Sequence, residues 1–245
     1  KWAATANPDQ LAEAQPREGL LVHVPLNEGL GDKVKGTVKG EGKTFKSKGF
    51  LTWDPKGKIG PAPRIKRGRT FDLGDLANFK IDQAFSYGAW IRSARGINGA
   101  VFARMDTARK HRGWDLWQQG AHFGAHLVDN YPDNAFKVIT QKAVLKFGQW
   151  NHVFVTYDGS GKAEGLRLYH NGVEQTKSVE SGSLKPNADI TSGTPLQIGQ
   201  RSAGEFFEDG FLQDMRIYER TLSAGEIKAL ADSGPLRAIL ATAAQ

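Results

Sequence analysis

One segment of the chain carries the residue types best suited to binding a ligand. Two runs of alternating side chains, Trp114–Gln118 and His122–Leu127, flank Gln119-Gly120, which predicts a β-hairpin with a two-residue loop. In this register Trp117 lies opposite His122, and Leu116 lies opposite Phe123. Successive side chains of a strand point to opposite faces. One face is apolar and is assigned to the core: Trp114, Leu116, Phe123, Ala125 and Leu127. The other face carries Asp115, Trp117, His122, Gly124 and His126.

A tryptophan beside a carboxylate and two imidazoles is suited to carbohydrate binding. An indole ring stacks on the apolar face of a pyranose while polar side chains bind its hydroxyls. We therefore predict a sugar site, with the following residues in it or at its border: Trp117, His122, Asp115, His126, Arg104, Tyr131 and Asn134. The alternative is that a long loop or a neighbouring domain covers this face and makes Trp117 a packing residue. A register shift of one residue would exchange the two faces.

His122 and His126 do not form a zinc site in this arrangement. Residues four apart on a strand are separated by about 13 Å, whereas a Zn–N bond is about 2.0–2.1 Å long. The same spacing suits a metal on a helix, where both rings share one face. We therefore exclude zinc on the predicted strand.

The elements that position these side chains are short strands. Alternating apolar runs recur along the chain, at Leu20–Leu26, Phe85–Ile91, His152–Tyr157, Leu166–Tyr169, Leu196–Gly199 and Phe211–Tyr218. The sequence His170-Asn171-Gly172-Val173 is typical of a type I′ hairpin turn. Many short strands together with 29 glycines predict an all-β fold, a sandwich of two antiparallel sheets.

Both ends of the chain differ from this strand-rich middle. Asn7-Pro8 predicts the start of a short helix. Ser223 and Glu226 form a capping-box pattern ahead of another helix. Gly234-Pro235 interrupts that pattern, so we predict a separate short helix over Leu236–Ala243. The predicted organisation is a connector over 1–19, one domain over 20–231 and a helical connector over 232–245.

The composition excludes several classes of protein. The chain has 245 residues, of which 39% are hydrophobic, and it has no cysteine. Disulfide frameworks, thiolate metal sites and cysteine nucleophiles are therefore excluded. No apolar run approaches the roughly 20 residues of a membrane-spanning helix. The chain begins with Lys1 rather than Met, and we interpret it as part of a longer protein.

Positive charge is concentrated in one stretch of the sequence. Twelve Lys and Arg residues lie between Lys33 and Arg69, against only Glu41 and Asp54, while the whole chain carries a net charge of +7. Such a stretch attracts an anionic polymer, a membrane face or an acidic neighbouring domain, or it simply keeps exposed strands soluble. The accompanying aromatic residues match no nucleic-acid-binding motif, so we expect no nucleic-acid partner.

Four segments of the sequence form a recognisable set. In chain order they are Gly148–Gly159 (GQWNHVFVTYDG), Leu168–Val173 (LYHNGV), Pro195–Gly199 (PLQIG) and Gly210–Ser223 (GFLQDMRIYERTLS). Together they resemble laminin-G-like domains of the concanavalin A-like superfamily, and Leu26–Gly29 resembles the end of that family's first strand. The resemblance implies a concanavalin A-like jelly-roll sandwich over residues 20–231.

A narrower resemblance concerns the parent protein. Gly113–Trp117 (GWDLW) and the alanine-rich C-terminal tail resemble the version of this domain embedded in large planctomycete proteins that carry cytochrome c-type domains. That resemblance implies an extracytoplasmic (periplasmic or cell-surface), multidomain parent, whose neighbouring domains are expected partners.

The resemblance also implies a structural calcium ion, which relatives often bind at the edge of the sandwich. Calcium takes six to eight oxygen ligands. Carried over by position, Asp214 is the first ligand candidate, followed by Asn27 and Asp72. The family usually has aspartate where Asn27 stands, so one carboxylate is missing. The alternative for Asp214 is a salt bridge to a neighbouring Arg or Lys.

No catalytic constellation is found. Glycosidases of this superfamily carry acidic residues on one strand, roughly E-x-D-x-x-E, and retaining hydrolysis needs two carboxyls about 5–5.5 Å apart. The acidic residues of Glu205–Asp209, and Asp129 and Asp133, lie beside Gly or Pro in expected loops, where such residues mostly form turns. We therefore expect no enzyme activity.

These observations favour a non-catalytic, lectin-like carbohydrate-binding module of a larger extracytoplasmic protein. The basic stretch favours an anionic polysaccharide as its ligand. The alternative is a structural or docking module that holds neighbouring domains and binds no glycan. Fold alone does not decide between them, because one fold hosts many functions.

Overall fold

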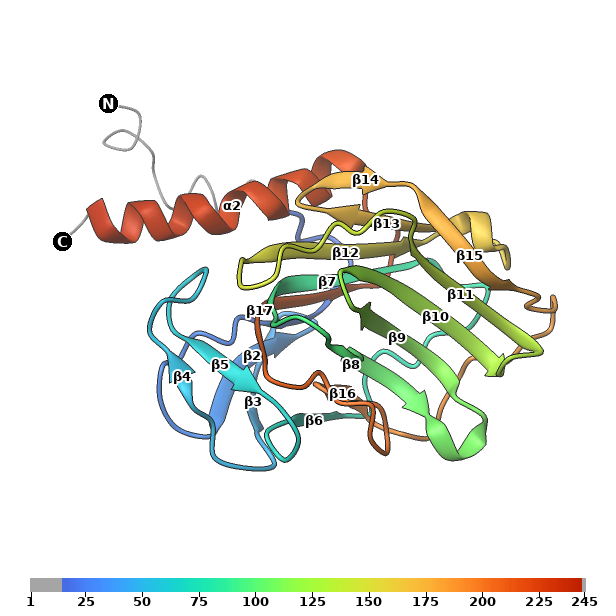
Figure 1. Ribbon diagram of the computed structural model, residues 1–245, viewed down its shortest axis with the longest axis horizontal. Coiled ribbons are helices and arrows are strands. Elements are labelled where there is room, and N and C mark those ends of the chain that lie inside the picture. The colour runs from blue at the N-terminus through green and yellow to red at the C-terminus, as the bar shows by residue number, and fades with distance from the viewer. Residues whose placement is uncertain (1–14, 244–245) are drawn as a thin grey trace.

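Two antiparallel β-sheets face each other, and a C-terminal helix lies along one side of the sandwich (Figure 1). The computed structural model describes residues 15–243, and the side chains of residues 15–233. The predicted all-β sandwich of two antiparallel sheets is confirmed. In the described part, no helix is both long and apolar enough to cross a membrane.

The larger sheet has ten strands. Eight of them lie in the order β14 (Val173–Gln175), β13 (Leu166–His170), β12 (Asn151–Tyr157), β7 (Phe85–Arg92), β17 (Gly210–Tyr218), β1 (Leu20–Val24), β2 (Lys33–Val38) and β3 (Glu41–Lys46). The remaining two are β5 (Ala62–Ile65), which pairs with β17, and β4 (Trp53–Asp54), which pairs with β5. The hairpin of β2 and β3 therefore forms one edge of this sheet.

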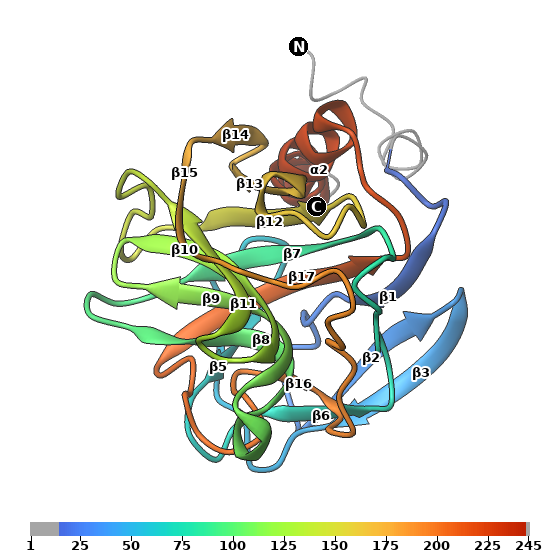
Figure 2. The same ribbon diagram turned by 90° about the vertical axis from the view of Figure 1, so that its right-hand side faces the viewer.

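The smaller sheet has seven strands and packs across the first (Figure 2). Its order is β15 (Lys177–Gly182), β11 (Asn134–Thr140), β10 (His122–Asn130), β9 (Arg112–Gln119), β8 (Asn98–Asp106), β16 (Leu196–Ile198) and β6 (Phe71–Gly74). Short 3₁₀ turns lie at η2 (Thr107–Arg109) and η3 (Ala163–Gly165).

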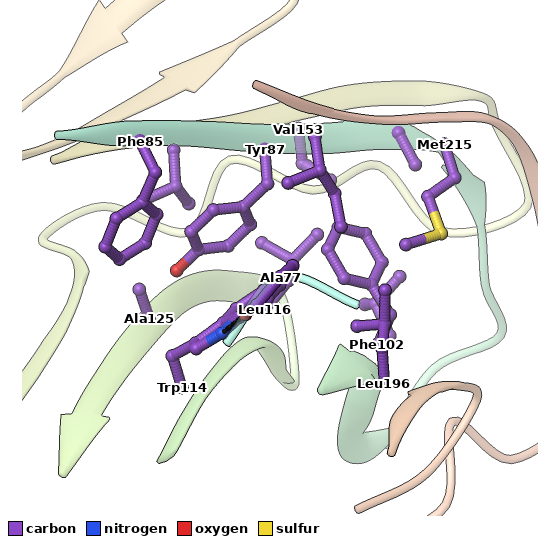
Figure 3. Packing of buried hydrophobic residues seen from close by; sticks show 14 of the residues in the cluster. Ala77, Phe85, Tyr87, Phe102, Trp114, Leu116, Ala125, Val153, Leu196 and Met215 are labelled. Atoms are coloured by element: carbon purple, nitrogen blue, oxygen red, sulfur yellow. Dashed lines mark hydrogen bonds between the residues drawn. The ribbon is translucent and has the colours of Figure 1, made fainter. Parts of the chain in front are cut away.

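The core lies between the sheets and centres on Trp114 of β9 (Figure 3). Its ring is fully buried, with its centroid 4.7 Å from that of Tyr87 on β7, and its Nε1 donates a hydrogen bond to the Ala77 carbonyl at 2.9 Å. The Tyr87 hydroxyl donates to the Asp115 carbonyl at 2.9 Å, which links the two sheets directly. Closely packed, tilted aromatic rings whose polar atoms have partners contribute both buried area and specific geometry.

The predicted hairpin forms, with the correct faces but a shifted register. All five residues predicted for the apolar face are buried in the core. However, the loop is Gly120-Ala121, so Trp117 lies opposite Gly124, and Asp115 lies opposite His126. Gly120 has a φ of +58°, as a two-residue turn with glycine in its first position requires. The register differs from the predicted one by two residues, and an even shift leaves every side chain on its face.

The C-terminal helix differs from the prediction in its length. Ser223 and Glu226 form the predicted capping box, with the Ser223 amide donating to Glu226 Oε2 at 2.9 Å and the Glu226 amide donating to Ser223 Oγ at 3.3 Å. The helix α2 (Ala224–Ala243) then runs without a break, so the separate helix predicted after Gly234-Pro235 is wrong, and the boundary after residue 231 falls inside α2. Leu222 and helix residues Ile227 and Leu230 pack on the outer face of the ten-stranded sheet. The helix predicted from Asn7-Pro8 lies outside the described residues.

Close packing of β7 against β12 depends on glycine at position 88. A Cβ added to Gly88 would lie 2.1 Å from Cδ2 of Phe154 and 2.3 Å from the Val153 carbonyl oxygen. We expect Gly88→Ala to lower the free energy of unfolding by about 1–3 kcal/mol, the usual effect of overpacking, as measured by urea denaturation. Gly42→Ala on β3 is the control, because a Cβ there has nothing within 4 Å. Equal midpoints for the two variants would contradict this packing.

Candidate functional site

A recessed pocket opens on the outer face of the seven-stranded sheet. Its cavity volume is about 190 Å³. Side chains from β8 to β11 form its floor and sides: Met105, Trp117, Gln119, His126, Val128 and Lys137. The connections between strands supply the remaining lining residues: His111, Tyr131, Arg201 and Glu205.

The pocket is built over a buried carboxylate. Asp115 is fully buried, and its Oδ2 accepts hydrogen bonds from Arg201 Nε at 2.9 Å and Arg201 Nη2 at 2.6 Å. Its Oδ1 accepts from His126 Nδ1 at 2.8 Å and from the His126 backbone amide at 3.0 Å. Because Nδ1 donates to this carboxylate, the orientation of the imidazole in the pocket is fixed.

The electrostatics of this cluster are set by burial and by the two side chains that donate to Asp115, Arg201 and His126. Burial alone would raise the pKa of Asp115, but His126 and Arg201 outweigh it and lower that pKa to about 2. Burial works against the charge on Arg201 as well, yet Asp115 and Glu205 raise the pKa of its guanidinium. Asp115 is therefore ionised near neutral pH and acts as a fixed negative charge rather than as a proton donor.

Trp117 forms one wall of the pocket and is half-buried rather than free in solvent. The Arg201 guanidinium lies over its ring at 4.3 Å from the centroid, and the His126 ring meets it edge-on at 5.9 Å. Arg201 and Glu205 belong to the loop between β16 and β17, which folds over this face through a hydrogen bond from the Ala100 amide to the Glu205 carbonyl. The alternative interpretation, in which a loop covers the face that carries Trp117, is therefore correct for part of that face.

The rim opposite Trp117 is aromatic and polar. The Tyr131 ring lies 6.0 Å from that of His111 and 6.5 Å from that of His126, both edge-on. The Tyr131 amide donates to the Lys110 carbonyl at 2.9 Å, which ties together the β8–β9 and β10–β11 connections. Glu205 Oε2 is buried, has no hydrogen-bond partner in the described part, and lies 3.5 Å from His111 Nε2.

Both permanently cationic side chains of the pocket are paired with carboxylates. Arg201 Nη1 contacts Glu205 Oε1 at 2.8 Å in addition to its bonds with Asp115. Lys137 Nζ contacts Glu180 Oε2 at 2.7 Å. The pocket therefore offers hydrogen-bonding groups and aromatic surface with little excess positive charge.

The structure brings together some of the predicted ligand residues and separates others. Trp117, His126 and Tyr131 line the same pocket. Asp115 was predicted to contact the sugar, but it is fully buried beneath the pocket and positions Arg201 and His126 instead. His122 shares the outer face but lies at the hairpin end, outside the pocket lining, with its Nδ1 2.8 Å from the Thr140 carbonyl.

Arg104 and Asn134 do not border the pocket. On β8 the side chain of Arg104 alternates away from Met105, which lines the pocket, and it donates to the Ser192 and Leu76 carbonyls. Asn134 holds the β10–β11 connection, because its Nδ2 donates to Asp129 at 2.7 Å and its Oδ1 accepts from the Lys185 amide at 2.7 Å. The correction for Arg104 follows from strand alternation, and the correction for Asn134 follows from its two hydrogen bonds.

Sequence reasoning missed five lining residues that contribute polar groups. The position of Lys137 could have been inferred from the sequence. Phe136 and Val138, on either side of it, are core residues of one strand, so alternation places Lys137 on the outer face. The position of Gln119 could not be inferred, because the predicted hairpin placed this residue in the loop, whereas in the structure it belongs to β9 and pairs with His122. His111, Arg201 and Glu205 lie in connections between strands, where no local pattern indicates which face a side chain reaches.

The proposed calcium ligands do not fit a calcium ion. Asp214 Oδ1 lies 2.7 Å from His23 Nε2 and accepts a hydrogen bond from Arg216 Nε at 3.0 Å, so the alternative of a salt bridge is correct. Asp72 belongs to the other sheet and accepts from the Gly74 amide at 2.9 Å, and Asn27 is exposed. Within residues 15–243, no group of three acidic or histidine side chains is arranged to hold a metal. A guanidinium beside the carboxylate takes the place that a cation would need.

The fold and the pocket define a two-sheet jelly-roll domain with a recessed pocket on one sheet. Residues 67–228 match the Laminin_G_3 family, described as the concanavalin A-like lectin/glucanases superfamily. The chain belongs to this family, and the resemblance drawn from the four sequence segments is confirmed at that level.

Several solved structures share the fold. The binding domain of Paraclostridial Mosquitocidal Protein 1 matches with a TM-score of 0.66 and 18% identity over 88% of this chain and 52% of that one. The receptor binding domain of botulinum neurotoxin D matches with a TM-score of 0.63 and 13% identity over 87% and 52% of the two chains. This chain thus spans about half the length of those toxin domains.

A third structure is matched over nearly its whole length. Domain 4 of AbnA, a GH43 extracellular arabinanase from Geobacillus stearothermophilus, in complex with arabinotriose, has a TM-score of 0.58 and 18% identity over 86% of this chain and 98% of that one. At these identities, all three likenesses show the fold alone.

Asp115→Asn tests the buried charge cluster. Since the folded-state pKa of Asp115 is lowered, its carboxylate stabilises the fold above its unfolded pKa near 3.9, and this contribution is lost as the pH falls towards 2. We expect the variant to lose about 2–5 kcal/mol of unfolding free energy at pH 7 and part of the acid dependence between about pH 4 and 2. Urea denaturation over this pH range measures both quantities. Asp133→Asn, at an exposed position, is the control, and an Asp115→Asn profile parallel to it would contradict the assignment.

Proposed function

We propose that this chain is a non-catalytic, lectin-like carbohydrate-binding module. The observation that carries the proposal is the pocket, in which Trp117, Tyr131 and His126 offer aromatic surface next to Gln119 and Glu205. Aromatic walls with a few convergent polar groups are the usual make-up of a small-molecule site. Two proteins of the same fold add support, since domain 4 of AbnA was solved with arabinotriose, and cell entry of botulinum neurotoxin type C depends on ganglioside molecules.

The size of the pocket favours one sugar ring. Its volume of about 190 Å³ lies below the range of roughly 300–1,000 Å³ that holds drug-sized ligands. Glu205 Oε2, which lacks a hydrogen-bond partner in the described part, would accept a hydrogen bond from a sugar hydroxyl. The proposed ligand is therefore a single ring or the end of a glycan chain.

The charge of the pocket favours an uncharged ring. Arg201 and Lys137 are already paired with carboxylates and have little excess charge to offer an anionic ligand. The anionic preference that the sequence favoured rests on the basic stretch Lys33–Arg69 alone, and that stretch contributes no residue to the pocket lining. We therefore propose neutral glycan as the ligand of the pocket.

Recognition without catalysis is supported by the state of the acidic side chains. A glycosidase needs one carboxyl that can give a proton and a second that attacks or activates water. Asp115 is fully buried with a pKa of about 2, and Glu205 is held by Arg201. Two of the structures of the same fold named above, the toxin domains, are binding domains as well.

We also propose that the module acts outside the cytoplasm as part of a larger protein, with the neighbouring domains as its partners. The resemblance of Gly113–Trp117 to domains of large planctomycete proteins supports this context. So does the similarity to one domain of an extracellular arabinanase. In that setting the module would hold its neighbours close to a glycan.

Trp117→Ala tests the pocket directly. We expect at least about a tenfold loss of affinity for a neutral polysaccharide, since 1.4 kcal/mol of lost stacking corresponds to tenfold. The measurement is affinity electrophoresis on arabinan, xylan and galactan, with sulfated and uronate polymers alongside. Tyr131→Ala is a second variant, because this ring is 37% exposed and its loss should leave the fold intact.

His122→Ala is the matched control for that experiment. His122 lies on the same face but outside the pocket lining, so its removal should leave binding unchanged. A loss of binding in His122→Ala alone would move the site to the hairpin end. No retardation of the unmodified protein by any polymer would leave the docking module as the better assignment.

Salt dependence separates the pocket from the basic stretch. Binding through hydrogen bonds and stacking should change less than about twofold between low and high salt, whereas binding carried by exposed lysines fades as the Debye length shrinks. Titration of the best neutral polysaccharide with sodium chloride measures this dependence. A steep decline would assign glycan binding to the lysines and contradict the pocket.

A further inference from the structure

Two large apolar side chains stand in solvent at one end of the β2–β3 hairpin. Phe50 is 87% exposed and Leu30 is 76% exposed, the highest values among the large hydrophobic residues of the described part. The loops that carry them meet at this end, because the Ser47 amide donates to the Asp32 carbonyl at 2.8 Å. Trp53 Nε1 also donates to the Gly31 carbonyl at 3.1 Å. The two apolar tips therefore belong to one loop cluster.

Exposed lysines surround these tips. Lys33 of β2 lies directly opposite Lys46 of β3, and Lys48 follows two residues later. Like charges placed opposite one another destabilise a sheet. Among the described residues, these lysines have one contact with a carboxylate, a long one between Lys46 Nζ and Asp32 Oδ2 at 3.6 Å. An anionic surface would relieve this repulsion.

Protection of a sheet edge explains only part of the arrangement. Lysines on an edge strand discourage pairing with another chain, and β3 is such a strand. Phe50 and Leu30 have the opposite effect, since exposed apolar tips promote association. Basic residues combined with protruding apolar ones are characteristic of proteins that bind anionic membrane surfaces.

We propose that this loop cluster docks on an anionic lipid surface. Phe50 and Leu30 enter the boundary between headgroups and acyl chains, while Lys33, Lys46 and Lys48 contact the acidic headgroups. A polysaccharide is the less suitable partner, because it would leave Leu30 in water, and an aliphatic side chain has no aromatic face to stack on a sugar ring. The lipid-binding surface shares no residue with the glycan pocket and does not depend on it.

The two surfaces lie on different parts of the sandwich. The β2–β3 hairpin is the edge of the ten-stranded sheet, away from β9 and β10 of the seven-stranded sheet (Figure 2). Docking through the edge would leave the pocket accessible. The module would then bind a membrane and a glycan at the same time.

Vesicle co-sedimentation of the full chain tests the proposal. We expect binding to vesicles of phosphatidylcholine mixed with phosphatidylglycerol, and little binding to phosphatidylcholine alone. The double variant Leu30→Ser/Phe50→Ser should lose at least about tenfold in affinity through lost apolar burial. Lys33→Glu/Lys46→Glu should lose a similar factor through lost attraction to acidic lipid.

Two matched controls sit elsewhere on the surface. Val173→Ser removes an apolar side chain that is 60% exposed on β14, and Lys142→Glu reverses an exposed charge. Both should bind vesicles like the unmodified protein, and all variants should melt at similar temperatures because the altered side chains are exposed.

Two outcomes would overturn the lipid assignment. The first is no binding of the unmodified protein to mixed vesicles. The second is binding that falls with the lysine variant but is unchanged in Leu30→Ser/Phe50→Ser, which would assign the surface to a soluble anionic polymer instead. Neither result would bear on glycan binding by the Trp117 pocket, because the two measurements use different ligands and different residues.

Discussion

The pocket depends on one buried interaction, the carboxylate of Asp115 held between Arg201 and His126. This carboxylate fixes the imidazole on the neighbouring strand and recruits a guanidinium from a distant loop. Arg201 then packs on Trp117 and binds Glu205, so the wall and the rim of the pocket follow from the same contact. Beneath it, Tyr87 binds the Asp115 backbone carbonyl from the opposite sheet. A buried ion pair of this kind adds little net stability compared with apolar packing, yet it is costly to break and therefore enforces one geometry.

The part of this arrangement that follows strand alternation was predictable from the sequence. The core face around Trp114 and the outer face around Trp117 were assigned correctly even though the hairpin register was not, because a shift of two residues preserves the faces. The role of Asp115 could not be inferred in this way. Its main partner lies 86 residues away along the chain, and nothing local indicates that a loop will cover this carboxylate. A residue predicted to face a ligand was therefore found beneath the pocket.

Asp214 shows where a family resemblance stops being informative. The sequence around it resembles relatives closely enough to predict the strand, and the strand is present as β17. Its carboxylate, however, meets Arg216 and His23 rather than further oxygen ligands. The pairing of β17 with β7 is interrupted between Gln213 and Arg216, and Asp214 has a φ of +53°. The fold depends on many apolar positions, whereas a metal site requires a few particular side chains. A family resemblance therefore predicts the fold more reliably than it predicts a metal site.

Accessibility, rather than residue type, distinguishes the candidate site from a similar cluster on the other sheet. The outer face of the ten-stranded sheet also carries an indole and an imidazole side by side, with the rings of Trp90 and His152 5.1 Å apart. There, however, Lys58 covers the Trp90 ring at 4.3 Å and both side chains are buried. Burial lowers the pKa of His152 to about 4, so this imidazole stays neutral inside the protein at neutral pH. Helix α2 occupies more of the same face. The open recess of the seven-stranded sheet is therefore what makes the Trp117 cluster the candidate site, because there, unlike at Trp90 and His152, the aromatic and polar groups line an open pocket.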